Sequence, residues 1–437
     1  MKKFLSILTA AAMLVSMTAC NGGDSSSDSN ESTSGTTTSE ADSSTSASSD
    51  SSTSSVVEEM PEVAYELGGE LTPTMIANSV LNKGNQARLA KFFKKLQAGE
   101  DVTVAYLGGS ITQGSSAGGG LCYADLTTKW LQEKYPDVKI NHVNAGIGAT
   151  GSYIGIHRAD RDVLQHDPDL VFVDFSVNDT SDRISTNKST YEGLIRKLWS
   201  HESAPAIICL AMTQENGTSV QTEHNEIAVK YDIPMISYRN AILDVINKGY
   251  IIWDDISDDN IHPNVQGHAV LTQMITNYLQ TVIDNIESID TAEPELAATG
   301  DSGIKYQNAE LVCVGDERCS SIGMFKENTA NFGNFGDSWM AKIKGGTEIT
   351  GALEFTVEAQ NIGILYGKMV NYGGMLDIYV DDELKMTINC DFPNGWGNYV
   401  EFQEVVAFME RGEHTVKIVP QQSDEIGLYY ISALTLS

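Results

Sequence analysis

The middle of the chain alternates between short apolar runs and longer amphipathic stretches. Five short segments between the helical stretches are predicted as strands, at residues 102–107, 139–144, 170–176, 206–210 and 235–238, and most of them are continuous runs of apolar residues. Apolar residues at helical spacing predict helices at 123–135, 153–165, 190–200, 219–231, 239–248 and 263–286. Strands that are apolar throughout and are joined by helices are typical of a parallel sheet covered on both faces. The pattern predicts a doubly wound α/β domain with a parallel five-stranded sheet.

Different patterns flank this domain. Residues 75–97 have apolar positions at near-helical spacing, which predicts one amphipathic helix packed on the domain. A polar segment at 291–303 is predicted to be a linker, and from 304 to 437 apolar positions recur with a period of two between turn signals. We therefore expect an α/β domain at 59–290 and an all-β jelly-roll sandwich at 304–437.

The start of the chain indicates export. Two lysines precede an apolar run at 4–15, which is too short to remain as a membrane-spanning helix. The segment MTAC, ending at Cys20, resembles a bacterial lipobox, in which Cys20 is lipidated after removal of a signal peptide at 1–19. The alternative is a secreted protein without lipid. Residues 20–58 are almost all Ser, Thr, Asp, Glu, Gly and Asn, which predicts a disordered tether to the outer face of a bacterial membrane.

Net charge and motif spacing limit the classes of partner and cofactor that the chain is expected to bind. The formal net charge of −31 argues against nucleic acid and against anionic membrane surfaces, so the lipid on Cys20 is the expected membrane contact. A polysaccharide or oligosaccharide substrate suits this charge. The sequence lacks dinucleotide and zinc spacings, and the acidic run at 254–259 lacks EF-hand spacing, so we expect no cofactor and no metal. Cys313 and Cys319 flank a short polar loop, and export would permit a local disulfide between them. Nothing in the sequence predicts the oligomeric state.

The first predicted strand runs directly into Gly108-Gly109-Ser110. A sharp, glycine-permitted turn at the carboxyl end of a strand presents a serine as a nucleophile, with helix N–H groups behind it. The same pattern also fits a serine that caps an ordinary strand-to-helix turn. A catalytic interpretation of Ser110 therefore requires a base and an oxyanion hole from elsewhere in the chain.

The next two strands also end in polar segments. The second is followed by NAGIGATGS at 144–152, where the backbone N–H of Gly148 or Ala149 can face a substrate oxygen, although a tight connection explains the glycines equally well. After the third strand, Asn178 can donate from its side-chain amide, and Asp179 is the better candidate for capping a turn or helix. Ligands bind outside the carboxyl ends of parallel strands, so these groups are expected beside the serine.

A carboxylate and a histidine lie near the end of the α/β domain, in DDNIHP. Asp259 and His262 are three residues apart, and Pro263 then opens the last predicted helix. A carboxylate that accepts from one imidazole nitrogen leaves the other nitrogen free as a general base. A lone histidine is more often structural, but this pair follows the last strand, on the side of the sheet that carries Ser110.

GGSITQG, NAGIGATGS, SVND and DDNIHP, in this order, resemble the four sequence blocks of the SGNH (GDSL-like) hydrolase superfamily. The resemblance covers roughly residues 77–286. It implies a flavodoxin-like α/β fold, with Ser110 as nucleophile, His262 as base and Asp259 as the carboxylate that orients the base.

The same resemblance implies an oxyanion hole. Its donors would be the Ser110 backbone N–H, a backbone N–H of Gly148 or Ala149, and the Asn178 side chain. Two positions depart from the family pattern: Gly109 stands where the name motif has Asp, and Ala149 stands where the family usually has Gly. Neither departure removes a needed group, because the first position transfers no proton and the second supplies only a backbone N–H.

Two smaller features stay open at this point. Tyr123 and Tyr153 fit either a sugar-stacking role at the rim of the site or a place in the core. Arg158 and Asp162 are four residues apart on a predicted helix, which favours an ion pair over contact with substrate.

The C-terminal domain resembles the small β-sandwich modules that accompany secreted carbohydrate esterases. Its Trp339, Trp396, Tyr372 and Tyr399 are candidates for a sugar-stacking platform, or equally for core positions. We therefore predict a serine esterase that hydrolyses O-acetyl groups on polysaccharide or oligosaccharide. The alternatives are a lipid or lysophospholipid esterase and a catalytically inactive glycan-binding lipoprotein of the cell surface.

Overall fold

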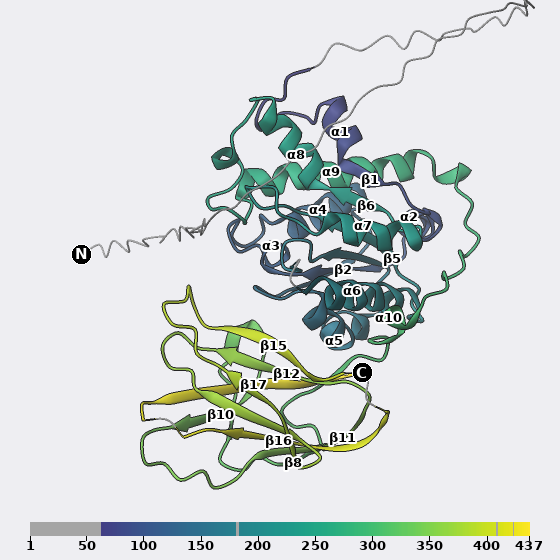
Figure 1. Cartoon of the computed structure of the whole chain (residues 1–437). Coiled ribbons are helices and arrows are strands. Elements are labelled where there is room, and N and C mark those ends of the chain that lie inside the picture. The colour runs from purple at the N-terminus through teal and green to yellow at the C-terminus, as the bar shows by residue number, and fades with distance from the viewer. Residues whose placement is uncertain (1–62, 181–182, 408–409, 423) are drawn as a thin grey trace, which may run out of the picture. The chain divides into compact units, whose positions relative to one another are not determined.

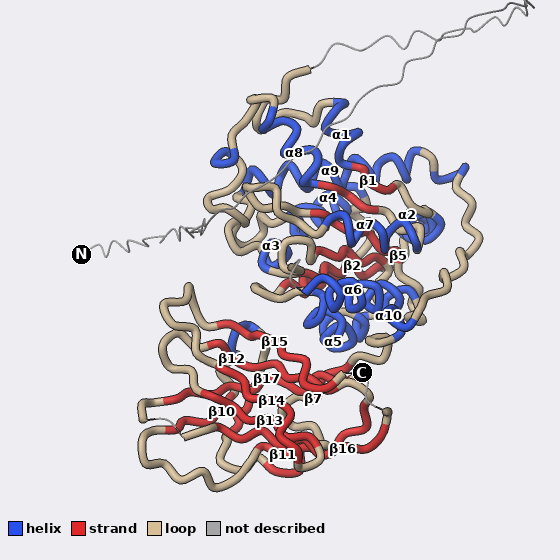
Figure 2. Tube along the Cα trace, viewed as in Figure 1, coloured by secondary structure: helices blue, strands red, loops and turns tan. Residues whose placement is uncertain are grey.

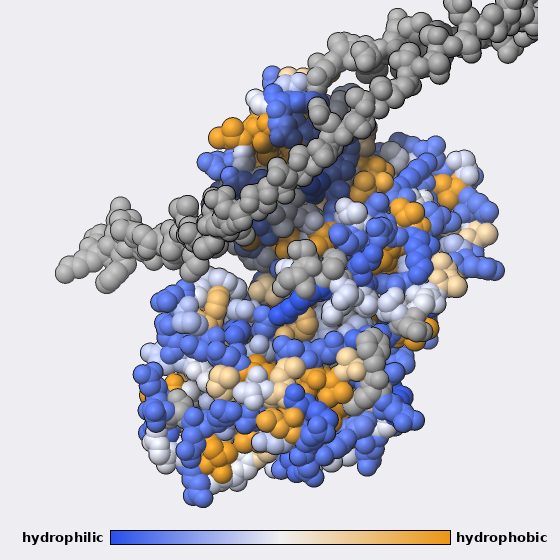
Figure 3. Space-filling view, in the orientation of Figure 1, coloured by the Kyte–Doolittle hydropathy of each residue, from blue (hydrophilic) through white to orange (hydrophobic). Residues whose placement is uncertain are grey.

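The computed structural model describes residues 63–180, 183–407, 410–422 and 424–437 (Figure 1). All described elements belong to one compact unit, Pro61–Ser437. The predicted signal peptide, the lipidation site Cys20 and the tether lie outside the described residues. Within the described part, no helix is long and apolar enough to cross a membrane. The face seen in Figure 3 is mostly hydrophilic, with scattered apolar residues.

A six-stranded sheet forms the centre of the α/β domain (Figure 2). Its strands are β1 (Val80–Asn82), β2 (Val102–Gly108), β3 (Ile140–Gly146), β4 (Leu170–Asp174), β5 (Ala206–Ala211) and β6 (Met235–Ser237), in the order β1-β6-β5-β4-β2-β3. The strands from β2 to β6 pair in parallel, so the predicted doubly wound α/β class is confirmed. Because β2 pairs with both β3 and β4, the carboxyl ends of these three strands lie side by side.

The sixth strand, β1, is not among the five predicted strands. The single helix predicted at 75–97 is wrong, because this segment holds α1 (Pro73–Ser79), β1 and α2 (Ala87–Ala98). The helical pattern is interrupted at Gly84, where φ is +59° and an added Cβ would lie 2.3 Å from the Pro234 nitrogen. Glycine lets the chain pass this close, and β1 then joins the edge of the sheet antiparallel to β6.

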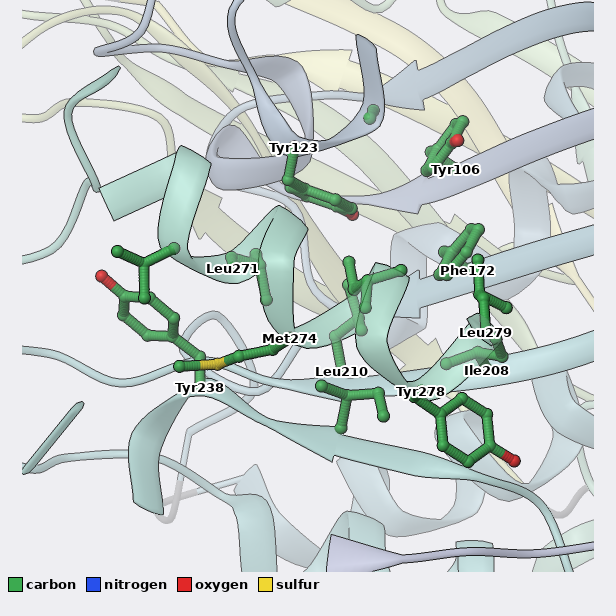
Figure 4. Close-up of a cluster of buried hydrophobic side chains, with 14 of the residues drawn as sticks. Tyr106, Tyr123, Phe172, Ile208, Leu210, Tyr238, Leu271, Met274, Tyr278 and Leu279 are labelled. Atoms are coloured by element: carbon green, nitrogen blue, oxygen red, sulfur yellow. The ribbon is translucent and has the colours of Figure 1, made fainter. Parts of the chain in front are cut away.

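Helices cover both faces of the sheet. One core joins the strands to α2, α4 (Tyr123–Lys134), α8 (Tyr238–Asn247) and α9 (Val265–Asp284), and the other joins them to α5 (Ser152–Asp162), α6 (Ile184–Trp199) and α7 (Gln221–Lys230). Alternate residues of β2 enter the two cores, as a pleated strand requires: Tyr106 lies in the first and Leu107 in the second. Figure 4 shows the first core, where α9 residues Leu271, Met274, Tyr278 and Leu279 lie near strand residues Tyr106, Phe172, Ile208 and Leu210.

The C-terminal residues form an antiparallel β-sandwich, as predicted. One sheet has the order β15-β12-β17-β10-β9, with β7 paired to β17, and the other has the order β14-β13-β16-β11-β8. The strands are β7 (Glu310–Val312), β8 (Cys319–Ser321), β9 (Lys326–Asn328), β10 (Ser338–Ile343), β11 (Leu353–Ala359), β12 (Ile362–Lys368), β13 (Met375–Val380), β14 (Glu383–Asn389), β15 (Tyr399–Val406), β16 (Gly412–Pro420) and β17 (Gly427–Leu436). A third core, which includes Trp339, Phe355 and Tyr429, lies within the sandwich. The short helix α10 (Asp301–Ile304) begins within the segment predicted as a linker.

The sandwich contacts α5 of the α/β domain within this one compact unit. The Tyr153 hydroxyl lies 2.9 Å from Thr435 Oγ1 of β17, and its ring stacks on Phe402 of β15 with 4.1 Å between ring centroids. A Cβ on Gly363 of β12 would lie 2.5 Å from the Tyr153 hydroxyl, so this glycine makes room for the tyrosine. Tyr153 is therefore an interior residue at the junction of the domains.

The disulfide considered for Cys313 and Cys319 does not form, and every described cysteine is a free thiol. Cys313 follows β7 in one sheet of the sandwich, whereas Cys319 begins β8 in the other sheet. Burial raises the pKa of both thiols. The sequence left this pairing open, because closeness along the chain does not tell which sheet each strand joins.

Candidate active site

Ser110 is the first residue of the short helix α3 (Ser110–Gln113), directly after β2 and Gly109. Its two preceding residues are glycines for a steric reason. A Cβ on Gly108 would lie 2.1 Å from Thr112 Oγ1, and a Cβ on Gly109 would lie 2.1 Å from Asn178 Oδ1. A glycine in place of the Asp of the name motif therefore lets the Asn178 side chain approach the backbone beside Ser110.

His262 and Asp259 reach Ser110 from the loop before α9. His262 Nε2 lies 2.8 Å from Ser110 Oγ, and His262 Nδ1 lies 2.8 Å from Asp259 Oδ2. The other Asp259 oxygen accepts the backbone N–H groups of Ile261 and His262, each at 2.7 Å. Burial raises the pKa of Asp259, but the hydrogen bonds outweigh burial, and the net pKa is lowered. An ionised Asp259 accepts from Nδ1–H, so the Nε2 lone pair of His262 faces the serine hydroxyl.

Two residues that sequence reasoning missed hold this loop in place. Ser257 Oγ lies 2.7 Å from the Asp259 carbonyl oxygen and 2.6 Å from the His262 carbonyl oxygen. The indole Nε1 of Trp253 also donates to the Asp259 carbonyl, at 2.6 Å. Because carbonyl groups at both ends of the pair are held, the backbone fixes the separation of the carboxylate and the imidazole. Short-range side-chain to backbone bonds of this kind leave no periodic signal in a sequence.

The residues predicted for the oxyanion hole approach Ser110 from β3 and β4. Gly148 N–H donates to Gln113 Oε1 at 2.9 Å, and a Cβ on Gly148 would lie 3.8 Å from Ser110 Cβ. Ala149 has a left-handed backbone with φ of +60°, which agrees with the glycine usual at this position. Among the described residues, neither the Ala149 N–H nor the Asn178 amide nitrogen has a hydrogen-bond partner. These two groups, unlike Gly148 N–H, remain available to a ligand.

A buried arginine joins the strand ends beneath the site. Arg158 of α5 is 0% exposed, and its Nη1 and Nη2 donate to the carbonyl oxygens of Ala145 and Gly108 at 2.7 and 2.9 Å. Arg158 Nη1 also pairs with Asp162 at 2.9 Å, which confirms the ion pair predicted from their spacing. Because Gly108 ends β2 and Ala145 lies near the end of β3, Arg158 fixes the strands that lead into Ser110 and Gly148.

A carboxyl group is also buried under the nucleophile turn. Asp174 ends β4 and is almost fully buried; burial raises its pKa to about 7. Its Oδ1 has no hydrogen-bond partner among the described residues. The nearby Thr112 Oγ1 lies 2.8 Å from the Tyr123 hydroxyl, and Tyr123 is 0% exposed. Tyr123 is therefore a core residue beneath the site and does not lie at the rim.

The chain is similar to a known protein family and to solved structures of an esterase. Residues 106–270 match the model of the GDSL-like lipase/acylhydrolase family. The chain is similar to the crystal structure of a two-domain esterase (CEX) active on acetylated mannans, co-crystallized with mannopentaose, with 30% sequence identity and a TM-score of 0.73, covering 83% of this chain and 97% of that one. A second crystal structure of that esterase gives 30% identity and a TM-score of 0.74, covering 83% of this chain and 98% of that one. No curated protein sequence matches the chain significantly.

Proposed function

Because this chain belongs to the GDSL-like lipase/acylhydrolase family, we propose that it is a serine esterase that removes O-acetyl groups from a polysaccharide or oligosaccharide. The observation that carries the proposal is the unbroken series of contacts from Ser110 Oγ through His262 to Asp259. A nucleophile, a general base and a carboxylate that orients the base are the groups that acyl transfer to water requires.

In the proposed first step, Ser110 Oγ attacks the carbonyl carbon of the ester while His262 Nε2 accepts the hydroxyl proton. Asp259, which its hydrogen bonds keep ionised, stabilises the imidazolium. The tetrahedral intermediate collapses when His262 returns the proton to the leaving sugar oxygen, and an acetyl ester remains on Ser110. A water molecule, deprotonated by His262, then attacks that ester, and acetate and the free serine are released.

We assign the oxyanion to three donors: the Ser110 and Ala149 backbone N–H groups and the Asn178 side chain. Ala149 is preferred over Gly148 because Gln113 already accepts the Gly148 N–H. A donor preorganised toward the developing oxyanion contributes about 10²- to 10³-fold to kcat. The same loss is expected when Asn178 is replaced by Ala.

The carbohydrate substrate is supported by the likeness to the mannan-active esterase, which extends over both domains. Of the aromatic residues considered for a sugar platform, Trp396 and Tyr372 are 72% and 55% exposed, whereas Trp339 is buried. The Trp396 ring stacks on Tyr399 with 5.0 Å between ring centroids, which holds it in place. An exposed and supported indole is a suitable surface for a sugar ring.

Export and anchoring complete the proposal. The lipobox-like segment ending at Cys20 supports a lipid-anchored protein on the outer face of a bacterial membrane. There the esterase would meet polymeric substrates before they enter the cell.

The decisive test measures acetate released from acetylated mannan and acetylated xylan by the wild type, Ser110→Ala and His262→Ala. We expect release by the wild type and a loss of at least about 10³-fold in both variants. Activity that survives both substitutions would contradict the assigned residues. In parallel, p-nitrophenyl acetate should be hydrolysed faster than p-nitrophenyl octanoate, and the reverse preference would favour the lipid esterase. A wild type that retains labelled mannan without hydrolysing it would favour the inactive binding protein.

A further inference from the structure

A second Asp–His pair lies buried behind the oxyanion side of the site. Asp179, the residue after Asn178, has one carboxylate oxygen 3.0 Å from His224 Nε2 of α7. Its other oxygen accepts the backbone N–H of Ser152 at 2.8 Å. Both side chains of the pair are 1% exposed, so neither contacts solvent or substrate.

Packing fixes the orientation of this pair. The His224 ring stacks on Tyr191 with 3.6 Å between ring centroids and 4° between planes. His224 Nδ1 has no partner among the described residues, and Nε2 faces a carboxylate oxygen that accepts, so Nε2 carries a hydrogen and donates it to Asp179. A Cβ on Gly151 would lie 2.5 Å from Asp179 Oδ1, so glycine at this position permits the contact with Ser152.

The Asp179 carboxylate connects the two segments that carry the proposed oxyanion donors. Asn178 precedes Asp179 directly, and Ala149 lies three residues before Ser152. Asp179 therefore ties the turn after β4 to the turn after β3, and His224 ties both turns to α7. A buried carboxylate is tolerated only when its oxygens are hydrogen-bonded. Without the His224 donor, the Asp179 carboxylate would lose one of the two hydrogen bonds that it accepts from described residues.

We propose that Asp179 and His224 form a positioning pair that sets the distance between the Asn178 amide and the Ala149 N–H. Neither residue touches the reacting atoms, and their effect on the rate passes through those two donors. The inference rests on the proposed function, because an oxyanion hole needs its donors in register only in an acyl-transfer enzyme.

The test compares two substitutions of His224 that differ in one property. His224→Phe keeps a ring against Tyr191 but removes the donor, whereas His224→Gln supplies an amide N–H close to the position of Nε2. With p-nitrophenyl acetate, we expect His224→Phe to lower kcat about 10- to 100-fold with little change in KM, and His224→Gln to recover most of that loss. An unchanged kcat in His224→Phe would overturn the proposal.

A double-mutant cycle with Asn178→Ala separates positioning from general support. Because the proposed effect passes partly through Asn178, the His224→Phe fold-loss should be at least about threefold smaller in the Asn178→Ala background than in the wild type. His157→Phe is the matched control, since His157 is also buried and binds the carbonyl oxygen of Tyr153 at 2.7 Å. Its effect should be the same in both backgrounds. Equal fold-losses for His224→Phe in both backgrounds would mean that the pair does not act through Asn178, which would overturn the proposal.

Hydrogen exchange decides the question independently of activity. In His224→Phe, peptides covering 144–152 and 175–180 should exchange faster by about tenfold or more, while a peptide covering 257–263 should not change. Unchanged exchange in the first two peptides would overturn the proposal. A wild type that hydrolyses no acetyl ester would contradict the proposed function, and the exchange result would still decide whether the pair holds these turns. Thermal unfolding of each variant identifies any that fails to fold.

Discussion

Asp174 is a carboxyl group buried beneath the site, and burial raises its pKa. It lies under the turn that presents Ser110, and its Oδ1 lacks a hydrogen-bond partner among the described residues. Its pKa in the folded protein is about 7, above the ordinary value of 3.8, because burial disfavours the ionised form. Because the folded protein holds this proton more tightly than the unfolded chain does, the free energy of unfolding is highest below the unfolded pKa. It falls as the pH rises from there through about 7.

Replacing Asp174 by Asn removes this titration while keeping the size of the side chain. We expect Asp174→Asn to gain stability over the wild type as the pH rises from 5 to 9, by roughly 3 kcal/mol, since each pKa unit corresponds to about 1.4 kcal/mol. Urea unfolding at the two pH values measures the gain, and the exposed Asp137→Asn serves as the control. A difference between Asp174→Asn and wild type that is the same at both pH values would contradict this account.

At this scale, the sequence reveals residues that lie within short motifs and misses those that act over distance. Ser110 and Asn178 were predicted because each directly follows a strand, and Asp259 and His262 were predicted from their three-residue spacing before the last helix. The structure brings these side chains together. The contact of Asp179 with His224 spans 45 residues, and that of Arg158 with Gly108 spans 50. No local pattern indicates such contacts, because they depend on how the strands are ordered in the sheet.

Among the elements, the strands of the parallel sheet were predictable and the edge strand β1 was not. Unbroken apolar runs identify β2, β4 and β5 because each of them is buried on both faces. β1 has only three residues, all partly buried, and it follows α1 directly. Its position depends on Gly84 meeting Pro234, which lies far along the chain. The spacing of apolar residues does not indicate this contact between Gly84 and Pro234.

The role of Gly84 can be separated from that of an ordinary glycine. Gly84 and Gly99 both have positive φ, at +59° and +79°, but an added Cβ would collide only at Gly84. We expect Gly99→Ala to cost about 1 kcal/mol of folding free energy from backbone strain, and Gly84→Ala to cost about 1–3 kcal/mol more from the clash. Chemical denaturation measures both losses. Equal losses would show that contact with Pro234 does not define this turn.

On the scale of the whole molecule, the two domains share a buried junction. The core on the α5 side of the sheet includes Tyr153 from the α/β domain and Leu365, Val400 and Ala433 from the sandwich. Lys197 of α6 also donates to the carbonyl oxygen of Ala309, just before β7, at 2.6 Å. An interface with a continuous apolar core is expected to unfold together with the domains it joins.

Gly363 provides a test of this junction. In Gly363→Ala, the new methyl group would lie 2.5 Å from the Tyr153 hydroxyl, and we expect a loss of about 1–3 kcal/mol with a lower Tm. Gly397→Ala is the control within the sandwich, since a Cβ there meets nothing within 4 Å. Differential scanning calorimetry reports both the Tm and the number of transitions. A Gly363→Ala variant as stable as Gly397→Ala would contradict tight packing at Tyr153.

Ser152 and Tyr153 are consecutive residues of α5 with attachments in different domains. The first gives its N–H to Asp179 beside the proposed oxyanion donors, and the second binds Thr435 in the sandwich. For this reason, exchanging either domain for one from another protein is expected to break these contacts. A sandwich of the same fold taken from another protein would have to supply a glycine opposite the Tyr153 hydroxyl and an aromatic ring under its face. In a domain-swapping library, these two positions should be kept before any loop is varied.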